Sequence, residues 1–143
     1  MKKNIQCISH GLIVSGSKIL VYDVEDKVKK KTFFRLIGGH IEFGESASEA
    51  LKREFKEEID QEIEIICKLD TFENIFVYKG SKQHEFVSLF KVEFLNKDIY
   101  NSNVIVGQEG PDRTFEAKWI EVSEFRNNKK VLYPPEVLSY LSK

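Results

Sequence analysis

One amphipathic helix set among many short β-rich runs most constrains the fold of this chain. Residues 46–59 carry apolar side chains at helical spacing, and Ser46 followed by Glu49 is typical of a capping box at a helix start. The runs on both sides are rich in β-branched and aromatic residues, which favours strands. The pattern therefore indicates an α/β (α+β) chain.

The β-rich runs predict a series of strands separated by turn residues. These strands are expected at residues 5–14, 18–22, 32–37, 63–69, 73–78, 84–94 and 115–122. The lysine-rich stretch 25–31 is expected to be a solvated loop. Residues 96–113 have few apolar anchors and contain glycine and proline, which predicts a long surface loop. From Pro135 the chain is expected to be helical again, with an apolar side formed by Val137, Leu138 and Leu141.

The composition limits the classes of function. At 143 residues we expect one domain, 1–143, with its own core. The 22 basic and 23 acidic residues leave a net charge of −1, which argues against binding long nucleic acid or an anionic membrane. No apolar run is typical of a signal peptide or a transmembrane span, so we expect a cytoplasmic protein. Cys7 and Cys67 lack CxxC spacing and are expected to be buried free thiols.

Acidic side chains occupy an unusual part of the 46–59 helix. A helical wheel places Glu54 and Glu58 within the apolar sector and Glu57 at its border, where burial penalises charge. Their spacing makes them neighbours that repel one another unless a cation lies between them. Carboxylate ligands without histidine or cysteine favour Mg²⁺, and Mn²⁺ is also suitable. The alternative is that these glutamates pair with lysines on neighbouring strands.

The loop before this helix adds a second constraint. Residues 38–45 supply glycines that let the backbone approach an ion or a phosphate closely, just ahead of a helix N-terminus. Together with the helix, this segment resembles the Nudix box, G-x5-E-x7-R-E-U-x-E-E-x-G-U, in which U is a bulky apolar residue. The positions that match are Gly39, Glu45, Arg53, Glu54, Phe55, Glu57 and Glu58. The chain departs from the pattern where Asp60 replaces the closing glycine and Gln61 the final apolar residue.

The resemblance implies a fold and an activity. The fold would be an α/β/α sandwich with a mixed β-sheet. The activity would be Mg²⁺-dependent hydrolysis of a phosphoanhydride bond in a small nucleoside diphosphate-linked substrate, such as a nucleoside triphosphate or an ADP-ribose-like compound. Homodimers are common in the family, and the sequence leaves this question open. The alternative function is a non-catalytic module of the same fold that binds a nucleotide or a partner.

The resemblance also implies roles for individual residues. The expected metal ligands are Glu54, Glu57, Glu58 and the backbone carbonyl of Gly38. Arg53 and Glu45 would pair to hold the loop against the helix, in support of catalysis by Glu57 and Glu58. Glu109, in the predicted late loop, is the candidate general base. Gly39 and Arg35 are the candidates for contacting substrate, although pairing of Arg35 with a surface acid is an equal alternative.

Several other residues have a structural and a functional interpretation. For His40 and His84 we favour a structural role over a role as ligand or base. The aromatic residues before and after the box could stack on a base, but aromatics on strands are more often part of a core. We apply the core interpretation to Phe33, Phe34, Phe72, Phe76, Tyr78 and Trp119.

Overall fold

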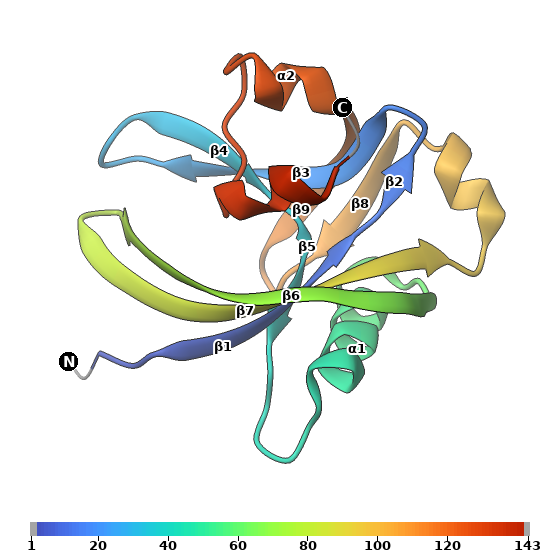
Figure 1. Cartoon of the computed structure of the whole chain (residues 1–143), viewed down its shortest axis with the longest axis horizontal. Coiled ribbons are helices and arrows are strands. Elements are labelled where there is room, and N and C mark those ends of the chain that lie inside the picture. The colour runs from blue at the N-terminus through green and yellow to red at the C-terminus, as the bar shows by residue number, and fades with distance from the viewer. Residues whose placement is uncertain (1–2, 142–143) are drawn as a thin grey trace.

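The computed structural model describes residues 3–141, so the two residues at each end of the expected domain lie outside it. Its strands form two sheets (Figure 1). The first has the order β5-β1-β7-β6; β1 and β7 are parallel and the other neighbours antiparallel, so this sheet is mixed, as expected. Its strands are β1 (Gln6–Leu12), β5 (Ile37–His40), β6 (Ile63–Tyr78) and β7 (Ser81–Phe94).

The second sheet is antiparallel throughout. Its order is β2-β3-β9-β8, and β4 pairs with β3. Single buried residues, Ile13 and Leu36, link the sheets where β1 passes to β2 and β4 passes to β5. The two sheets are therefore joined closely at two points. The strands are β2 (Val14–Ser15), β3 (Lys18–Asp26), β4 (Lys31–Arg35), β8 (Val104–Gln108) and β9 (Thr114–Glu121).

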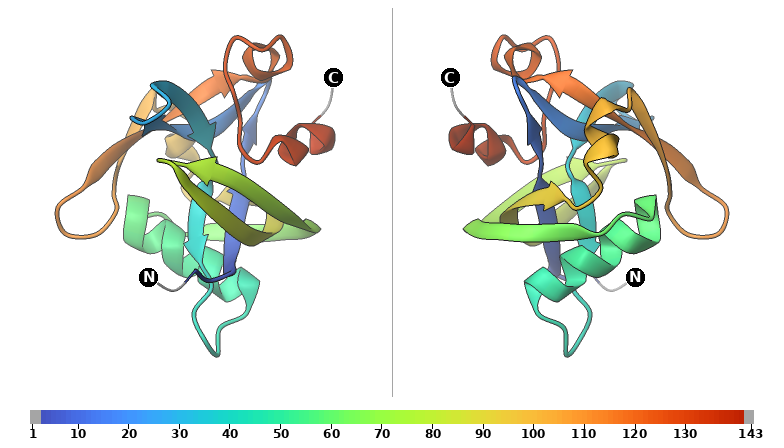
Figure 2. Two further views of the ribbon diagram at one scale, coloured as in Figure 1. Left: turned by 90° about the vertical axis from the view of Figure 1, so that its left-hand side faces the viewer. Right: turned by 90° about the vertical axis from the view of Figure 1, so that its right-hand side faces the viewer.

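Helices lie on two opposite sides of these sheets. Helix α1 (Ala47–Ile59) is on one side, and α2 (Val122–Arg126) lies on the other with the 3-10 helix η2 (Pro135–Tyr140) (Figure 1, Figure 2). This arrangement confirms the expected α/β/α sandwich. Within residues 3–141, no helix has both the length and the apolar character needed to cross a bilayer.

Two hydrophobic clusters form the core. Leu51 and Phe55 of α1 contribute to the first cluster, and Phe125 of α2 contributes to the second. Strand β7 supplies both, with Leu89 in the second cluster and Phe90 in the first, because successive side chains of a strand point to opposite faces. The alternation of apolar residues along the strands therefore builds the core on both sides of the sheets.

Helix α1 begins and ends as local signals dictate. The Glu49 backbone N–H donates to Ser46 Oγ at 3.2 Å, and the Ser46 N–H donates to Glu49 Oε1 at 2.9 Å, which completes the predicted capping box. The helix ends at Asp60, which has a φ of 53°. Asp60 thus takes the left-handed conformation that a closing glycine would take.

Several predicted strand boundaries are wrong. Residues 63–69 and 73–78 belong to one strand, β6, which keeps its pairing with β7 through two register shifts. The predicted strands 5–14 and 32–37 are each divided where the chain passes between sheets. The lysine-rich loop is shorter than expected, because β3 continues to Asp26 and β4 begins at Lys31.

The prediction of one long surface loop at residues 96–113 is also wrong. This segment contains a 3-10 helix, η1 (Lys97–Asn101), and strand β8. Ile105 of β8 is buried in the cluster beneath α1, while its neighbours Val104 and Val106 are exposed. The α1 residues that share this cluster with Ile105 are thus distant from β8 in the sequence. The chain end is helical from Pro135, but as the 3-10 helix η2, with Val137 and Leu141 buried.

Both cysteines are free, as predicted, but the prediction that they are buried is wrong. Cys7 and Cys67 are exposed. Cys7 lies on the same face of β1 as Ser9, which is buried, but it stands nearer the start of the strand, where the side chain is exposed. Cys67 lies at a register shift of β6. Apolar neighbours in sequence therefore did not indicate burial at these positions.

Candidate active site

Arg53 of α1 lies at the centre of the predicted site. Its Nε donates to Glu45 Oε2 at 2.7 Å, and its Nη2 donates to Glu45 Oε1 at 2.9 Å. Nη2 also donates to the carbonyl of His40, the last residue of β5, at 2.9 Å. The two bonds from Arg53 to Glu45, together with one from the Glu42 N–H, lower the pKa of Glu45 to about 2. Arg53 and Glu45 thus pair as expected and tie the loop to the helix.

The Glu54 carboxylate packs against the backbone of Gly39. A Cβ placed on Gly39 would lie 2.4 Å from Glu54 Cδ, so only glycine leaves room for this carboxylate. Glu54 Oε1 accepts from Arg53 Nη1 at 2.9 Å, and Glu57 Oε2 accepts from the same nitrogen at 3.2 Å. Mutual repulsion between these two glutamates is therefore relieved by an arginine of their own helix. These contacts pair the two glutamates with Arg53, and not with lysines on neighbouring strands as in the alternative interpretation.

Glu58 is the acid in the least favourable surroundings. Its Oε1 is buried and has no hydrogen-bond partner among the described residues. Burial, followed by the charges of Glu54 and Glu109, raises the pKa of Glu58 to about 8. Glu57, in contrast, has a side chain that is 60% exposed. The helix therefore presents one confined carboxylate and one that is largely exposed.

A groove beside α1 brings Glu109 to these glutamates. Its volume is about 290 Å³, and its lining includes residues of the β8–β9 connection. Figure 2 shows this connection beside α1. The Glu109 N–H donates to the carbonyl of Arg113 at 2.8 Å, which closes the turn at the tip of this connection. The helix and a segment about fifty residues later thus share one acidic groove. The lining residues are Glu54, Glu57, Glu58, Gln108, Glu109 and Gly110.

The residues of this acidic groove fit a hard divalent cation. All the charged donors are carboxylate oxygens, and the buried Glu58 Oε1 has an unused lone pair. In the part of the chain that the structure describes, no three His, Cys, Asp or Glu side chains are already gathered as a metal-binding group. The geometry gives a reason, since Arg53 holds an oxygen of both Glu54 and Glu57. Each of these carboxylates has a second oxygen that Arg53 does not hold, and that oxygen is available to a metal ion.

A second pocket lies next to the acidic groove, between the two sheets. This inter-sheet pocket has a volume of about 180 Å³ and shares Glu109 with the groove. Aromatic side chains from both sheets, Phe33, Phe76 and Tyr78, line it together with Arg35 and Arg113. These aromatics are thus placed at a pocket as well as against one another, because Phe33 also makes an edge contact with Tyr78. The pocket therefore combines aromatic faces with two arginines and two glutamates, Glu85 and Glu109.

Arg35 does not stand free in the inter-sheet pocket. Its Nη2 donates to Glu85 Oε1 at 2.6 Å, and the side chain of Asn74 donates to the same oxygen at 3.4 Å. The expected alternative of ion pairing is confirmed, but the partner is not a surface acid, since Glu85 is only 2% exposed. Glu85 lies two residues before the buried Val87 on β7. This alternation is the sequence signal by which its inward position could have been found.

His40 lines the inter-sheet pocket, whereas the other remaining candidates have structural positions. His84 Nε2 lies 2.6 Å from Glu73 Oε2 on the neighbouring strand β6, away from the acidic groove. Phe34 and Phe72 pack against the second hydrophobic cluster, and Trp119 packs against the first. The core interpretation is therefore confirmed for these three aromatic residues.

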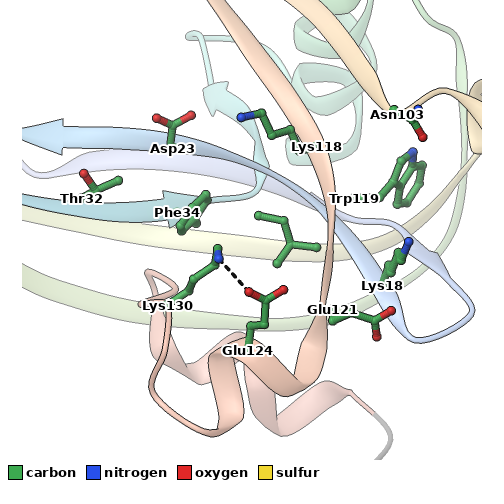
Figure 3. Close-up of a pocket in the computed structure, with 11 residues that line it drawn as sticks. Lys18, Asp23, Thr32, Phe34, Asn103, Lys118, Trp119, Glu121, Glu124 and Lys130 are labelled. Carbon is green, nitrogen blue, oxygen red and sulfur yellow. Dashed lines mark hydrogen bonds and ion pairs between the residues drawn. The ribbon is translucent and has the colours of Figure 1, made fainter.

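A larger cavity of about 610 Å³ lies on another part of the molecule (Figure 3). Its lining alternates lysines with acids, and Lys130 is already paired with Glu124 at 2.7 Å. None of the box residues lines it. The glutamates of the box therefore line the smaller acidic groove and not this larger cavity.

Comparison with known proteins identifies the family of the chain. The chain matches the NUDIX domain over residues 9–140. It belongs to the Nudix family. A comparison with curated proteins found no match. As a Nudix protein the chain is a hydrolase, the enzyme class that its box predicts.

Solved structures of low sequence identity share the Nudix fold. The E. coli ORF135 protein is 18% identical, with a TM-score of 0.63, over 94% of this chain and 85% of that one. A MutT NUDIX hydrolase from Burkholderia pseudomallei is 17% identical, with a TM-score of 0.62, over 85% and 86%. A NUDIX hydrolase from Nitrosomonas europaea is 18% identical, with a TM-score of 0.62, over 95% and 85%.

Proposed function

We propose that this Nudix hydrolase cleaves a phosphoanhydride bond in a small nucleoside diphosphate-linked substrate, such as a nucleoside triphosphate or an ADP-ribose-like compound. The observation that carries the proposal is the acidic groove, in which three glutamates of α1 face Glu109 of the β8–β9 connection. An adjoining aromatic pocket supports a nucleotide over a bare pyrophosphate. We take residues 1–143 to act as one domain in the cytoplasm.

Mg²⁺, or Mn²⁺ in its place, is the cofactor in this proposal. Glu54, Glu57 and Glu58 would hold it, and the backbone carbonyl of Gly38 is a further candidate ligand. When bound, such an ion supplies positive charge that offsets the charge developing on the phosphoryl oxygens. The unpartnered Oε1 of Glu58 supports this ligand set, because a ligand would remove the penalty of burying it.

The other residues of the site position these groups or move a proton. Arg53 and Glu45 fix the loop and helix relative to each other, so that the glutamates keep their alignment. Glu109 is placed across the groove from them, where its carboxylate can take a proton from the water that attacks phosphorus. The bond to the leaving phosphate then breaks, and the water oxygen stays on the attacked phosphorus.

The inter-sheet pocket would hold the nucleoside part of the substrate. Its aromatic walls offer faces on which a base can stack. Arg35 keeps hydrogen-bond donors that Glu85 does not use, so it remains the candidate for a polar contact there. Gly39 has no side chain, and the Glu54 carboxylate occupies the space beside it. Gly39 therefore remains a candidate for contact with substrate through its backbone.

The test is a panel of nucleoside triphosphates, ADP-ribose, dinucleoside polyphosphates and nucleotide sugars, incubated with the protein and Mg²⁺. Release of phosphate, pyrophosphate and nucleoside monophosphate identifies the bond that is cut. Glu57→Gln and Glu58→Gln should each lower the rate by about a hundredfold or more. Glu64→Gln is the matched control, because Glu64 is exposed on β6 and lies outside the groove.

Two outcomes would count against the proposal. If no member of the panel is cut, the alternative of a nucleotide-binding module without catalysis is favoured. If a substrate is cut equally well by the wild type and both glutamine variants, the reaction does not use the acidic groove.

A further inference from the structure

Two β-hairpins enclose the inter-sheet pocket, one from each sheet. The β3–β4 hairpin contributes Val24 and Phe33 to its lining, and the β6–β7 hairpin contributes Tyr78 and Gln83. Both hairpins project to the same side of the molecule (Figure 1). No strand pairing joins them, since β4 pairs with β3 and β6 pairs with β7. Side-chain contacts therefore hold the two hairpins together, through the Arg35–Glu85 pair within the pocket and through further contacts at the hairpin tips.

Asp26 connects the two hairpins at their tips, and its two oxygens have different partners. Oδ1 accepts from the backbone N–H groups of Val28 and Lys29, at 3.0 and 3.2 Å, within its own hairpin. Oδ2 accepts from the backbone N–H of Lys79, at 3.1 Å, at the tip of the other hairpin. One oxygen thus shapes a turn, and the other connects the two sheets.

The surroundings of Asp26 show that this contact is built into the fold. The residue is only 3% exposed, although it lies near a lysine-rich turn. Burial by itself would raise its pKa, but the three backbone N–H donors outweigh burial and lower it. Beside it, the Tyr78 hydroxyl donates to the carbonyl of Glu25 at 3.5 Å, and the Tyr78 ring meets Phe33 edge-on. These contacts all bridge the same two hairpins.

We propose that Asp26 is a positioning residue that fixes the width of the inter-sheet pocket and thereby selects nucleotides by the size of their base. The proposal rests on the proposed function, because it assumes that the pocket receives the base. Asp26 lies two residues beyond Val24, and Lys79 lies one residue beyond Tyr78, so their bond closes the pocket just past its lining. A pocket held at one width favours one size of base over another.

The difference between the two oxygens provides a selective variant. In Asp26→Asn the side-chain oxygen can still accept from Val28 and Lys29. The new NH₂ group then faces the Lys79 N–H and cannot accept from it. Asp26→Asn should therefore release the second hairpin while preserving the turn of the first. Tyr78→Phe is a second variant, which removes a weaker contact at the same junction without touching a buried charge. Asp98→Asn is the matched control, because it removes an exposed carboxylate far from both hairpins.

The first readout is amide hydrogen exchange in the full chain without nucleotide. The Lys79 amide should exchange at least about tenfold faster in Asp26→Asn than in the wild type, with α1 amides unchanged. Tyr78→Phe should shift it in the same direction by less, and Asp98→Asn should leave it alone. An unchanged exchange rate of the Lys79 amide in Asp26→Asn would overturn the hairpin contact. So would a loss of α1 protection in Asp26→Asn combined with an unchanged Lys79 rate in Tyr78→Phe.

The second readout is equilibrium binding of the α,β-methylene analogues of UTP and GTP with Mg²⁺. The wild type should distinguish the two, and Asp26→Asn should move the ratio of their Kd values toward one by about fivefold. Asp98→Asn should keep the wild-type ratio. A wild-type ratio near one, or a ratio that persists in Asp26→Asn after the hairpins separate, would overturn the role in selection. Neither readout requires turnover, so a wild type that binds but does not hydrolyse would contradict the proposed function alone.

Discussion

Arg53 holds Glu45 through two parallel hydrogen bonds, from Nε to Oε2 at 2.7 Å and from Nη2 to Oε1 at 2.9 Å. Because both bonds join planar groups, the loop before α1 cannot rotate relative to the helix without breaking them. The remaining nitrogen, Nη1, reaches Glu54 and Glu57. One guanidinium therefore sets the position of the loop and of two proposed metal ligands.

The first prediction concerns the pH dependence that this pair confers. The pKa of Glu45 is lowered to about 2, so the folded protein holds fewer protons here than the unfolded chain between that pH and 4.5. The stabilisation is present above 4.5 and is lost as the pH falls toward 2. Glu45→Gln should therefore lower the free energy of unfolding near pH 6, and the difference from wild type should shrink as the pH falls. Urea unfolding from pH 6 to pH 2.5 measures it.

Activity provides a second readout of the same variant. Loss of the pair should lower Mg²⁺-dependent activity or metal affinity by about ten- to a hundredfold, as for other residues that orient metal ligands. A pH-independent difference in unfolding free energy between wild type and Glu45→Gln would contradict the assigned pair.

The second prediction concerns the space between Gly39 and Glu54. In Gly39→Ala the new Cβ would lie 2.4 Å from Glu54 Cδ, so the carboxylate has to move. Because the displaced atoms are the end of a flexible side chain, we expect stability to change little. Metal affinity should fall by about tenfold or more. A Mn²⁺ titration followed by electron paramagnetic resonance measures the affinity, and unchanged binding would show that this position of Glu54 is not needed.

The third prediction separates two neighbouring acids of the groove. In excess chelator near pH 7, Glu58→Gln should raise the free energy of unfolding by on the order of 1 kcal/mol, because it removes a carboxyl group whose pKa folding raises to about 8. Glu57→Gln should leave it unchanged, since that side chain is 60% exposed. Both variants should lose the rise in melting temperature that Mg²⁺ causes in the wild type. Equal stability of the two variants in chelator would contradict the assigned burial.

The fourth prediction concerns the end of α1. Asp60 has a φ of 53°, a conformation that aspartate tolerates better than alanine does. Asp60→Ala should therefore destabilise the protein by about 1 kcal/mol, whereas Asp60→Gly should be neutral or slightly stabilising. Both should retain activity, because Asp60 does not line the acidic groove. Thermal unfolding of the two variants checks the order, and a more stable alanine variant would refute it.

The helix and its loop could be predicted because their signals are local. Ser46 and Glu49 are three residues apart, and the caps they form need no tertiary contact. The Arg53–Glu45 pair followed from the Nudix resemblance, and the structure confirms its geometry. The helical wheel also placed Glu54 and Glu58 in the apolar sector, which agrees with the confined carboxylate of Glu58.

The features that could not be predicted depend on contacts between distant segments. The sequence predicts a loop where β8 lies, because the residues that bury Ile105 belong to α1 and other strands and give no local signal. The partner of Arg35 lies fifty residues away, on a strand of the other sheet. The apolar neighbours of Cys7 predict burial, but other segments bury β1 only from Ile8 onward and leave Cys7 exposed.

The central claim is that the glutamates of α1 share one divalent cation, and a crystal soaked in Mn²⁺ tests it most directly. An anomalous difference map should show a peak within ligand distance of Glu54, Glu57 and Glu58. A map without a peak in the acidic groove would contradict it.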